Sequence, residues 1–190
     1  MTGQIPDTVD LDETVYSITA VGGAGLFVAE EHGFESRALS SACWRGFICT
    51  YAVRDDRLLL DELQLGLEPD HPTVTLHGRK PRTLGRRHRY HGSVVYRRLA
   101  MPVPFTGRLL LGAELDLYVH MGFQPAWYHE RVVELVVESG HVSARTDRSA
   151  EMAEVRRRRE HVEGRPAESE LVDWIAHTFS LDYRYSWPDP

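Results

Sequence analysis

The chain of 190 residues lacks the features that mark several specialised classes of protein. It has only two cysteines, Cys43 and Cys49, which excludes a disulfide-stapled scaffold. On one extended strand they would lie about 20 Å apart, too far for a disulfide, so we interpret them as buried apolar residues. No apolar run approaches the roughly 18 residues of a membrane span, and the first residues lack a secretory signal. We therefore expect a cytoplasmic protein with no membrane contact.

Motifs that would fix a reaction are also missing. The sequence has no G-x-S-x-G nucleophile elbow, no H-E-x-x-H, H-x-H or C-x-x-C pattern and no G-x-G-x-x-G loop. Its ten histidines do not have the spacing of a metal site. We therefore predict no metal and no cofactor. The sequence favours a protein that is not an enzyme, although a site built from distant residues stays open.

The order of hydrophobic patterns predicts an α+β fold. Strand-like stretches, two pairs of which form hairpins, occupy residues 14–19, 44–53, 58–65, 94–99, 103–111, 131–138 and 141–144. Helical patterns follow over 149–163 and from Ser169, and the alternation over 179–187 predicts a last strand. We expect a mainly antiparallel sheet, with a rolled half-barrel as its candidate form, and two C-terminal helices.

The domain boundaries follow from the same pattern. Residues 1–13 are acidic and poor in apolar side chains, so we expect a mobile or loosely docked arm. Residues 14–190 are expected to form a single domain, with a β-rich part over 14–146 and a helical C-terminal part over 147–190. The glycines at 22, 23 and 25 are expected to end the first strand.

Charge is segregated along the chain. Residues 1–70 hold 13 acidic and four basic residues, a net charge of −9, whereas no acid occurs between Asp70 and Glu114. The candidate partner-binding arginines in this basic stretch are Arg79, Arg82, Arg86, Arg87 and Arg89. Either the segment 79–98 pairs with the acidic first third, at no more than about 1 kcal/mol per exposed pair, or it binds an acidic protein or a small anion. The net charge of −6 argues against nucleic acid.

A second arginine run, residues 156–159, lies within the predicted helix over 149–163. Glu154 stands four residues before Arg158, and two more glutamates follow the run. We interpret this run as a solvated helix face with internal ion pairs.

A candidate site lies around residues 116–128. If 114–120 is extended, Asp116, Tyr118 and His120 share one face and could relay a proton as catalytic groups. A polar sheet face with a structural histidine gives the same pattern, so both interpretations stay open. Arg45 could grip an anionic group of a ligand. The aromatics that could line a pocket, or simply form core, are Trp44, Phe47, Phe123, Trp127 and Tyr128.

Several short motifs resemble those of a group of small bacterial proteins. The chain has W-R-G-F at 44–47, Y-x-V-x-D-x-x-L-x-L at 51–60, F-T-G-x-L at 105–109 and Y-V-H-M-G-F at 118–123. The group carries W-R-G-Y, W-E-I-x-D-x-x-L-Y-L, F-x-G-E-L and Y-V-H-M-G-Y, over roughly residues 44–142 of this chain. Phe47 and Phe123 replace tyrosines, and Arg108 replaces a glutamate, which counts against a catalytic acid there. The resemblance implies one sheet-based domain in which the 44–47 and 118–123 segments meet, and it implies no activity.

These observations support one leading hypothesis and one alternative. The leading hypothesis is a non-enzymatic binding protein that acts through a protein–protein surface, as an immunity or accessory factor in a bacterial conflict or defence system. The alternative is a small-molecule enzyme or ligand-binding domain with a pocket around Arg45, Tyr118, His120 and Tyr128. The sequence does not predict the oligomeric state.

Overall fold

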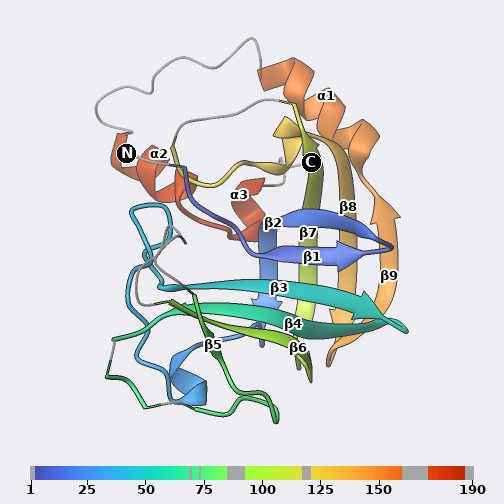
Figure 1. The fold of residues 1–190 in the computed structure, drawn as a ribbon. Coiled ribbons are helices and arrows are strands. Elements are labelled where there is room, and N and C mark those ends of the chain that lie inside the picture. The colour runs from blue at the N-terminus through green and yellow to red at the C-terminus, as the bar shows by residue number, and fades with distance from the viewer. Residues whose placement is uncertain are drawn as a thin grey trace.

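The computed structural model describes residues 3–68, 70–72, 74–84, 93–116, 121–159 and 171–186. Figure 1 shows a sheet-dominated molecule with a few helices, so the expected α+β class is confirmed. The strands are β1 (Thr8–Leu11), β2 (Thr14–Ala24), β3 (Phe47–Arg54), β4 (Arg57–Gly66), β5 (Arg82–Thr83), β6 (Ser93–Pro102), β7 (Thr106–Leu115), β8 (His129–Glu138) and β9 (His141–Asp147). The helices are η1 (Glu30–His32), η2 (Ala126–Tyr128), α1 (Ser149–Arg159), α2 (Leu171–Thr178) and α3 (Tyr183–Ser186).

The nine strands of the described residues belong to one mixed sheet in the order β3-β1-β2-β7-β8-β9-β4-β6-β5. Every pair is antiparallel except β1 with β3. Because β3 also pairs with β4, the seven strands from β3 to β4 in this order form a closed ring. The two predicted hairpins are β3–β4 and β8–β9, and both are confirmed.

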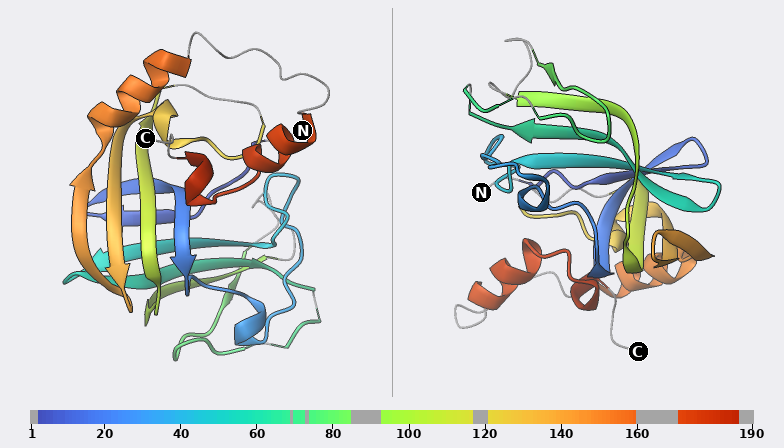
Figure 2. Two further views of the ribbon diagram at one scale, coloured as in Figure 1. Left: turned by 180° about the vertical axis from the view of Figure 1, so that it is seen from behind. Right: turned by 90° about the horizontal axis from the view of Figure 1, so that it is seen from below.

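The sheet folds into two layers that cross each other (Figures 1 and 2). One layer holds β7, β8, β9 and the second half of β2, and the other holds β1, β3, β4 and β6. Strand β2 turns from one layer to the other, because its first residues pair with β1 and those after Ser17 pair with β7. The main hydrophobic core fills the space between the layers and includes the fully buried Tyr51, Leu63 and Phe105.

A second, smaller core lies on the outer face of β2, β7 and β8. Ala20, Leu110 and Val132 form its floor, and Trp127 and Met152 cover it from η2 and α1. Helix α1 is mostly polar, and its Met152 and Val155 are both buried here. Figure 2 shows α1, α2 and α3 on this side of the molecule, away from β6. None of the described helices is long and apolar enough to cross a membrane.

The N-terminal residues correct one expectation. The segment expected to be a mobile arm forms β1, which lies between β2 and β3 and hydrogen-bonds to both. Its Val9 and Leu11 are buried in the main core, and Asp7 before it is 5% exposed. The alternation of polar and apolar residues in β1 is hard to recognise in the sequence, because the strand has only four residues and four acids surround its two apolar side chains.

The glycines of β2 correct a second expectation. The strand continues to Ala24, and Gly23 pairs with Gly107 of β7 at a positive φ in both residues. A Cβ at either position would clash with the backbone of the opposite strand. The glycines therefore allow two strands to approach closely instead of ending one of them.

The C-terminal segment corrects a third. Residues 183–186 form helix α3, not a strand, although Asp182 makes one parallel bridge with Val21 of β2. The Asp182 carboxylate accepts a hydrogen bond from the Arg184 backbone N–H at 3.0 Å. This side chain caps the first turn and favours a helix over the extended chain that the alternation of aromatics indicates.

Candidate functional site

The three residues of the expected proton relay cannot be placed together. Tyr118 and His120 lie outside the described residues. Asp116 is exposed, and its carboxylate accepts a hydrogen bond from the Arg156 guanidinium at 2.7 Å. Gly122 has a φ of +70°, as expected for a position that favours glycine, and Pro125 precedes η2.

The aromatics of η2 belong to the second core. Trp127 and Tyr128 are 7% and 8% exposed, and their rings meet edge to face at 6.2 Å. Next to them, His129 is 3% exposed, its ring fills the space above Gly112, and its Nδ1 bonds to the Pro125 carbonyl at 3.2 Å. Burial lowers the pKa of His129. These residues pack against each other and do not line an open site.

Arg45 forms a half-buried ion pair with Asp7. Its two terminal nitrogens donate to the two carboxylate oxygens at 3.0 and 2.5 Å, and its Nε donates to the Phe47 carbonyl at 2.9 Å. The guanidinium also lies 5.0 Å from the centre of the Phe47 ring. The Asp7 carboxylate accepts a further bond from the Cys49 N–H. Burial raises the pKa of Asp7, while Arg45 and the Cys49 N–H act in the opposite direction. The arrangement ties β1 to the start of β3.

Trp44, the neighbour of Arg45, points the other way. The predicted strand over 44–53 begins only at Phe47, and Trp44 lies on the preceding loop with 74% of its surface exposed. Its indole N–H donates to the Ser41 carbonyl at 2.6 Å. The loop is closed by the Ser40–Cys43 bridge, and the Ile5 N–H bonds to the Ala42 carbonyl. We call residues 40–46 the Trp44 loop.

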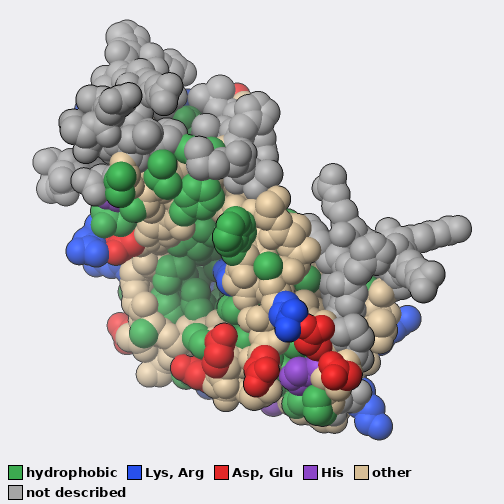
Figure 3. Space-filling view, turned by 90° about the vertical axis from the view of Figure 1, so that its left-hand side faces the viewer, with side chains coloured by type: hydrophobic (Ala, Val, Ile, Leu, Met, Phe, Trp, Pro, Cys, Tyr) green, Lys and Arg blue, Asp and Glu red, His purple; other side chains and the backbone are tan. Residues whose placement is uncertain are grey.

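Several distant segments meet beside the Trp44 loop. The Gln4 N–H bonds to the Gly122 carbonyl, and the Phe123 N–H bonds to the Thr178 carbonyl at the end of α2. The 44–47 and 121–123 segments are thus linked through the N-terminal residues. Residues 118–120 lie outside the described residues. Figure 3 views this side of the molecule and shows hydrophobic side chains gathered in a hollow, with acidic, basic and histidine side chains below it.

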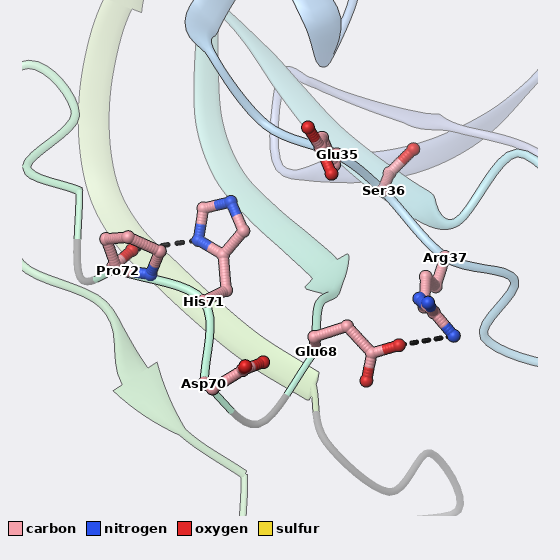
Figure 4. Close-up of a pocket in the computed structure, with 7 residues that line it drawn as sticks. All are labelled: Glu35, Ser36, Arg37, Glu68, Asp70, His71 and Pro72. Carbon is pink, nitrogen blue, oxygen red and sulfur yellow. Dashed lines mark hydrogen bonds and ion pairs between the residues drawn. The ribbon is translucent and has the colours of Figure 1, made fainter.

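A pocket of about 430 Å³ adjoins the Trp44 loop. It lies between residues 35–37, which run beside the Trp44 loop, and Glu68 with residues 70–72, which follow β4 (Figure 4). The Ser36 hydroxyl donates to the Arg45 carbonyl at 2.8 Å, so the pocket wall and the Trp44 loop are directly bonded. We call this cavity the acidic pocket; it is lined by Glu35, Ser36, Arg37, Glu68, Asp70, His71 and Pro72.

The described part of the arginine segment lies on the surface. Arg79 and Arg82 are exposed, and the Arg79 Nε donates to the Arg98 carbonyl at 3.1 Å. Arg97 pairs with Glu62 of the acidic first third. Arg86, Arg87 and Arg89 lie outside the described residues. Both interpretations of this segment therefore stay predictions.

The sequence patterns did not predict two clusters of polar contacts, one around Arg156 and one around Glu134. Arg156 is not on a solvated face: it donates to the Trp127 and His129 carbonyls at 2.7 and 2.9 Å and holds η2 against α1. Arg157 and Arg158 do pair with Glu154, as the helix spacing predicts.

The second cluster surrounds Glu134, which is 3% exposed. Its carboxylate accepts bonds from the Tyr183 hydroxyl and from Arg148, and Arg108 lies 3.6 Å away. Burial alone would raise the pKa of Glu134, but the bonds from Tyr183 and Arg148 outweigh it and lower that pKa. The cluster fastens α3 to the sheet. No spacing in the sequence could have found these partners, because they are 14 to 49 residues apart.

Comparison with protein-family models, curated proteins and solved structures found no match. Within the described ranges, no group of three or more His, Cys, Asp or Glu side chains is arranged to hold a metal ion. The geometry of the described residues is therefore the basis for what the site can do.

Proposed function

We propose that the protein is a binding protein that acts through a protein–protein surface centred on Trp44. The observation that carries the proposal is the 74% exposure of this large aromatic side chain. Leaving an indole in water forgoes the free energy of burying it, whereas tryptophan is among the residues that contribute most to protein–protein binding. An exposed tryptophan therefore suits a surface that a partner covers.

The second support is that the side chain is held in place before any partner binds. The indole N–H is bonded to Ser41, the loop is closed at Cys43, and the Arg45–Asp7 pair anchors its end. Gly46 has a φ of +80° and lies against the backbone of Arg37, which fixes the exit from the loop. A group that is already ordered loses little conformational entropy on binding, so more of its contact energy is kept as affinity.

The alternative of a small-molecule site is weakened by the same contacts. Arg45 would have to release Asp7 to grip an anionic ligand, which would leave the buried Asp7 carboxylate without its counter-charge. Tyr128 is buried in the second core. That alternative rests on Tyr118 and His120, which are not among the described residues.

An immunity or accessory role in a bacterial conflict system is the biological setting that we propose for this surface. A protein of this kind acts by covering its partner, which needs a strong interface and no catalytic groups. The Trp44 loop supplies an aromatic anchor of the type that such interfaces use.

Affinity capture with matched variants tests the proposal. Wild-type protein, Trp44→Ala and Val15→Ala are each immobilised and exposed to lysate of the source cells; Val15 is 61% exposed and serves as the control. We expect a partner that wild type and Val15→Ala retain and Trp44→Ala loses. Equal retention by Trp44→Ala would overturn the proposal. Charge reversal of Arg79 and Arg82 in the same assay tests whether the arginine segment binds an acidic partner instead.

A further inference from the structure

Trp44 is held in its exposed position by a hydrogen bond and not by packing. Because 74% of its surface is exposed, little of the side chain is packed, whereas its indole N–H donates to the Ser41 carbonyl at 2.6 Å. The orientation of the Ser41 peptide group therefore sets the direction in which the indole points. A contact that fixes this peptide group also positions Trp44.

The Ser41 carbonyl is also fixed by Gln4. The side-chain amide of Gln4 donates to this carbonyl at 3.1 Å, so one oxygen accepts hydrogen bonds from both Gln4 and Trp44, as its two lone pairs allow. The next residue, Ile5, donates its backbone N–H to the Ala42 carbonyl at 2.8 Å. Residues 4 and 5 therefore hold two successive carbonyls of the Trp44 loop, and Gln4 shares an acceptor with the indole.

Gln4 also bonds to the segment that carries Gly122. Its backbone N–H donates to the Gly122 carbonyl at 2.6 Å, and Gly3 makes a parallel bridge with Gly122. Gly122 is buried at a φ of +70°, and a Cβ at this position would overlap the Thr178 carbonyl. Phe123, the next residue, donates its N–H to the same Thr178 carbonyl at 2.9 Å. The end of α2 thus packs directly on the segment that Gln4 contacts.

The chain that follows α2 is anchored in the second core. Tyr183, the first residue of α3, packs on Gly22 of β2 and donates its hydroxyl to the buried Glu134 carboxylate. Figure 1 shows α3 beside β2. We call residues 178–186 the C-terminal tail. The tail is therefore fixed at two points, by Tyr183 in the second core and by the contact of Thr178 with the 122–123 segment.

We infer that Gln4 is the positioning residue of Trp44 and that it couples the binding surface to the docking of the C-terminal tail. The path runs from Thr178 through Gly122 and Gln4 to the Ser41 carbonyl. With the tail docked, the indole is ordered before a partner arrives. When the tail is released, the Trp44 loop loses this support, and part of the contact energy is lost in ordering it. The inference rests on the proposed function and adds a means of regulating it.

The ¹⁵N indole signal of Trp44 reports its hydrogen bond in the absence of any partner. The signal is assigned by its loss in Trp44→Phe. The test variant is Gln4→Met, which keeps the length of the side chain and removes the amide donor, and the control is the same change at Gln64 of β4. We expect the indole signal to shift in Gln4→Met, with hydrogen exchange faster by at least about twofold, and to match wild type in Gln64→Met. An unchanged signal in Gln4→Met would overturn the role of Gln4.

The tail is tested at Tyr183, its anchor in the second core. Tyr183→Ala removes the ring and the hydroxyl, whereas Tyr183→Phe keeps the ring and lacks only the hydroxyl. We expect the indole signal of Trp44 to move in Tyr183→Ala in the same direction as in Gln4→Met, and less far in Tyr183→Phe. Amide signals of β4 and β6 at their wild-type positions identify the variants that are folded. An indole signal that stays in place in the folded tyrosine variants would overturn the coupling.

Titration of the retained partner separates this inference from the proposed function. We expect Gln4→Met and Tyr183→Ala to bind about fivefold more weakly than wild type, the low end for coupling between two sites, and Gln64→Met to bind as wild type does. Wild-type affinity in the first two variants, with Trp44→Ala still defective, would keep the Trp44 surface and overturn its regulation by the tail. A partner that Trp44→Ala retains would overturn the proposed function, and the indole measurements, which need no partner, decide separately whether the tail positions Trp44.

Discussion

Trp44 and Trp127 occupy opposite kinds of environment, although the sequence gives no reason to separate them. Each stands close to an arginine that bonds to a backbone carbonyl, Arg45 to Phe47 and Arg156 to Trp127 itself. Arg156 clamps η2 onto α1 and buries Trp127 to 7% exposure, whereas Arg45 turns inward to Asp7 and leaves Trp44 74% exposed. Arg45 orders the Trp44 loop and leaves Trp44 exposed to a partner. Arg156 holds η2 against α1 and so keeps Trp127 buried.

The largest expected difference between the two regions is in stability. Trp127→Ala removes a buried indole from the second core, and we expect the free energy of unfolding to fall by about 3–5 kcal/mol. Trp44→Ala removes an exposed side chain with one hydrogen bond, and we expect a change within about 0.5 kcal/mol. Urea unfolding of both variants gives the comparison. Similar losses in the two would mean that Trp44 is part of the core and not a presented surface group.

The Asp7–Arg45 pair is the next largest effect. Asp7→Ala leaves a half-buried guanidinium without its counter-charge, and we expect a loss of about 3 kcal/mol, the low end for a broken buried pair because Arg45 is 28% exposed. The matched control is Asp10→Ala, whose pair with Arg54 is exposed, for which we expect less than about 1 kcal/mol. Denaturant unfolding measures both. If Asp7→Ala costs no more than Asp10→Ala, the pair does not anchor the Trp44 loop.

The two regions should also respond to pH in opposite directions. The pKa of His129 is lowered, so below about pH 6.5 the unfolded chain binds a proton that the folded chain does not, and stability falls as pH falls through this window. The pKa of Asp7 is raised above 3.8, so here the folded chain binds a proton that the unfolded chain does not. The stabilisation from protonated Asp7 is therefore complete below about pH 3.8 and is lost as pH rises through the raised pKa.

Unfolding at pH 7.5, 6.5 and 5.5 measures the contribution of His129. Between pH 7.5 and 5.5 we expect wild-type stability to fall, by at most about 1.4 kcal/mol per pH unit from a single group. His129→Gln should flatten this fall, because it removes the group that is forced to stay neutral. An unchanged slope in that variant would show that the burial of His129 does not control acid sensitivity.

Local patterns in the sequence predict the elements that form from neighbouring residues. The hairpins β3–β4 and β8–β9 and the start of α1 follow from alternation, turns and the change to a helical period. The sequence does not reveal β1, because its place depends on pairing with β3 some 40 residues away, nor the helix α3, because the Asp182 cap competes with an alternating pattern.

The candidate site shows the same limit. Sequence reasoning selected Trp44 and Arg45 as ligand-binding residues, but only the contact of Arg45 with Asp7 shows that one of them faces inward and the other faces outward. The acidic pocket was not predicted at all. It lies between residues 35–37 and the residues at 68 and 70–72, and the hydrogen bond from the Arg37 N–H to the Gly66 carbonyl joins these two segments, which are about 30 residues apart.

The most direct test of the Trp44 surface is calorimetric titration of the retained partner with wild type, Trp44→Ala and Val15→Ala. A central aromatic anchor contributes at least about 2 kcal/mol, so we predict that Trp44→Ala weakens binding by about 30-fold or more while Val15→Ala binds as wild type does. If Trp44→Ala binds within about twofold of wild type, the exposed tryptophan is not the centre of the binding surface, and the account is contradicted.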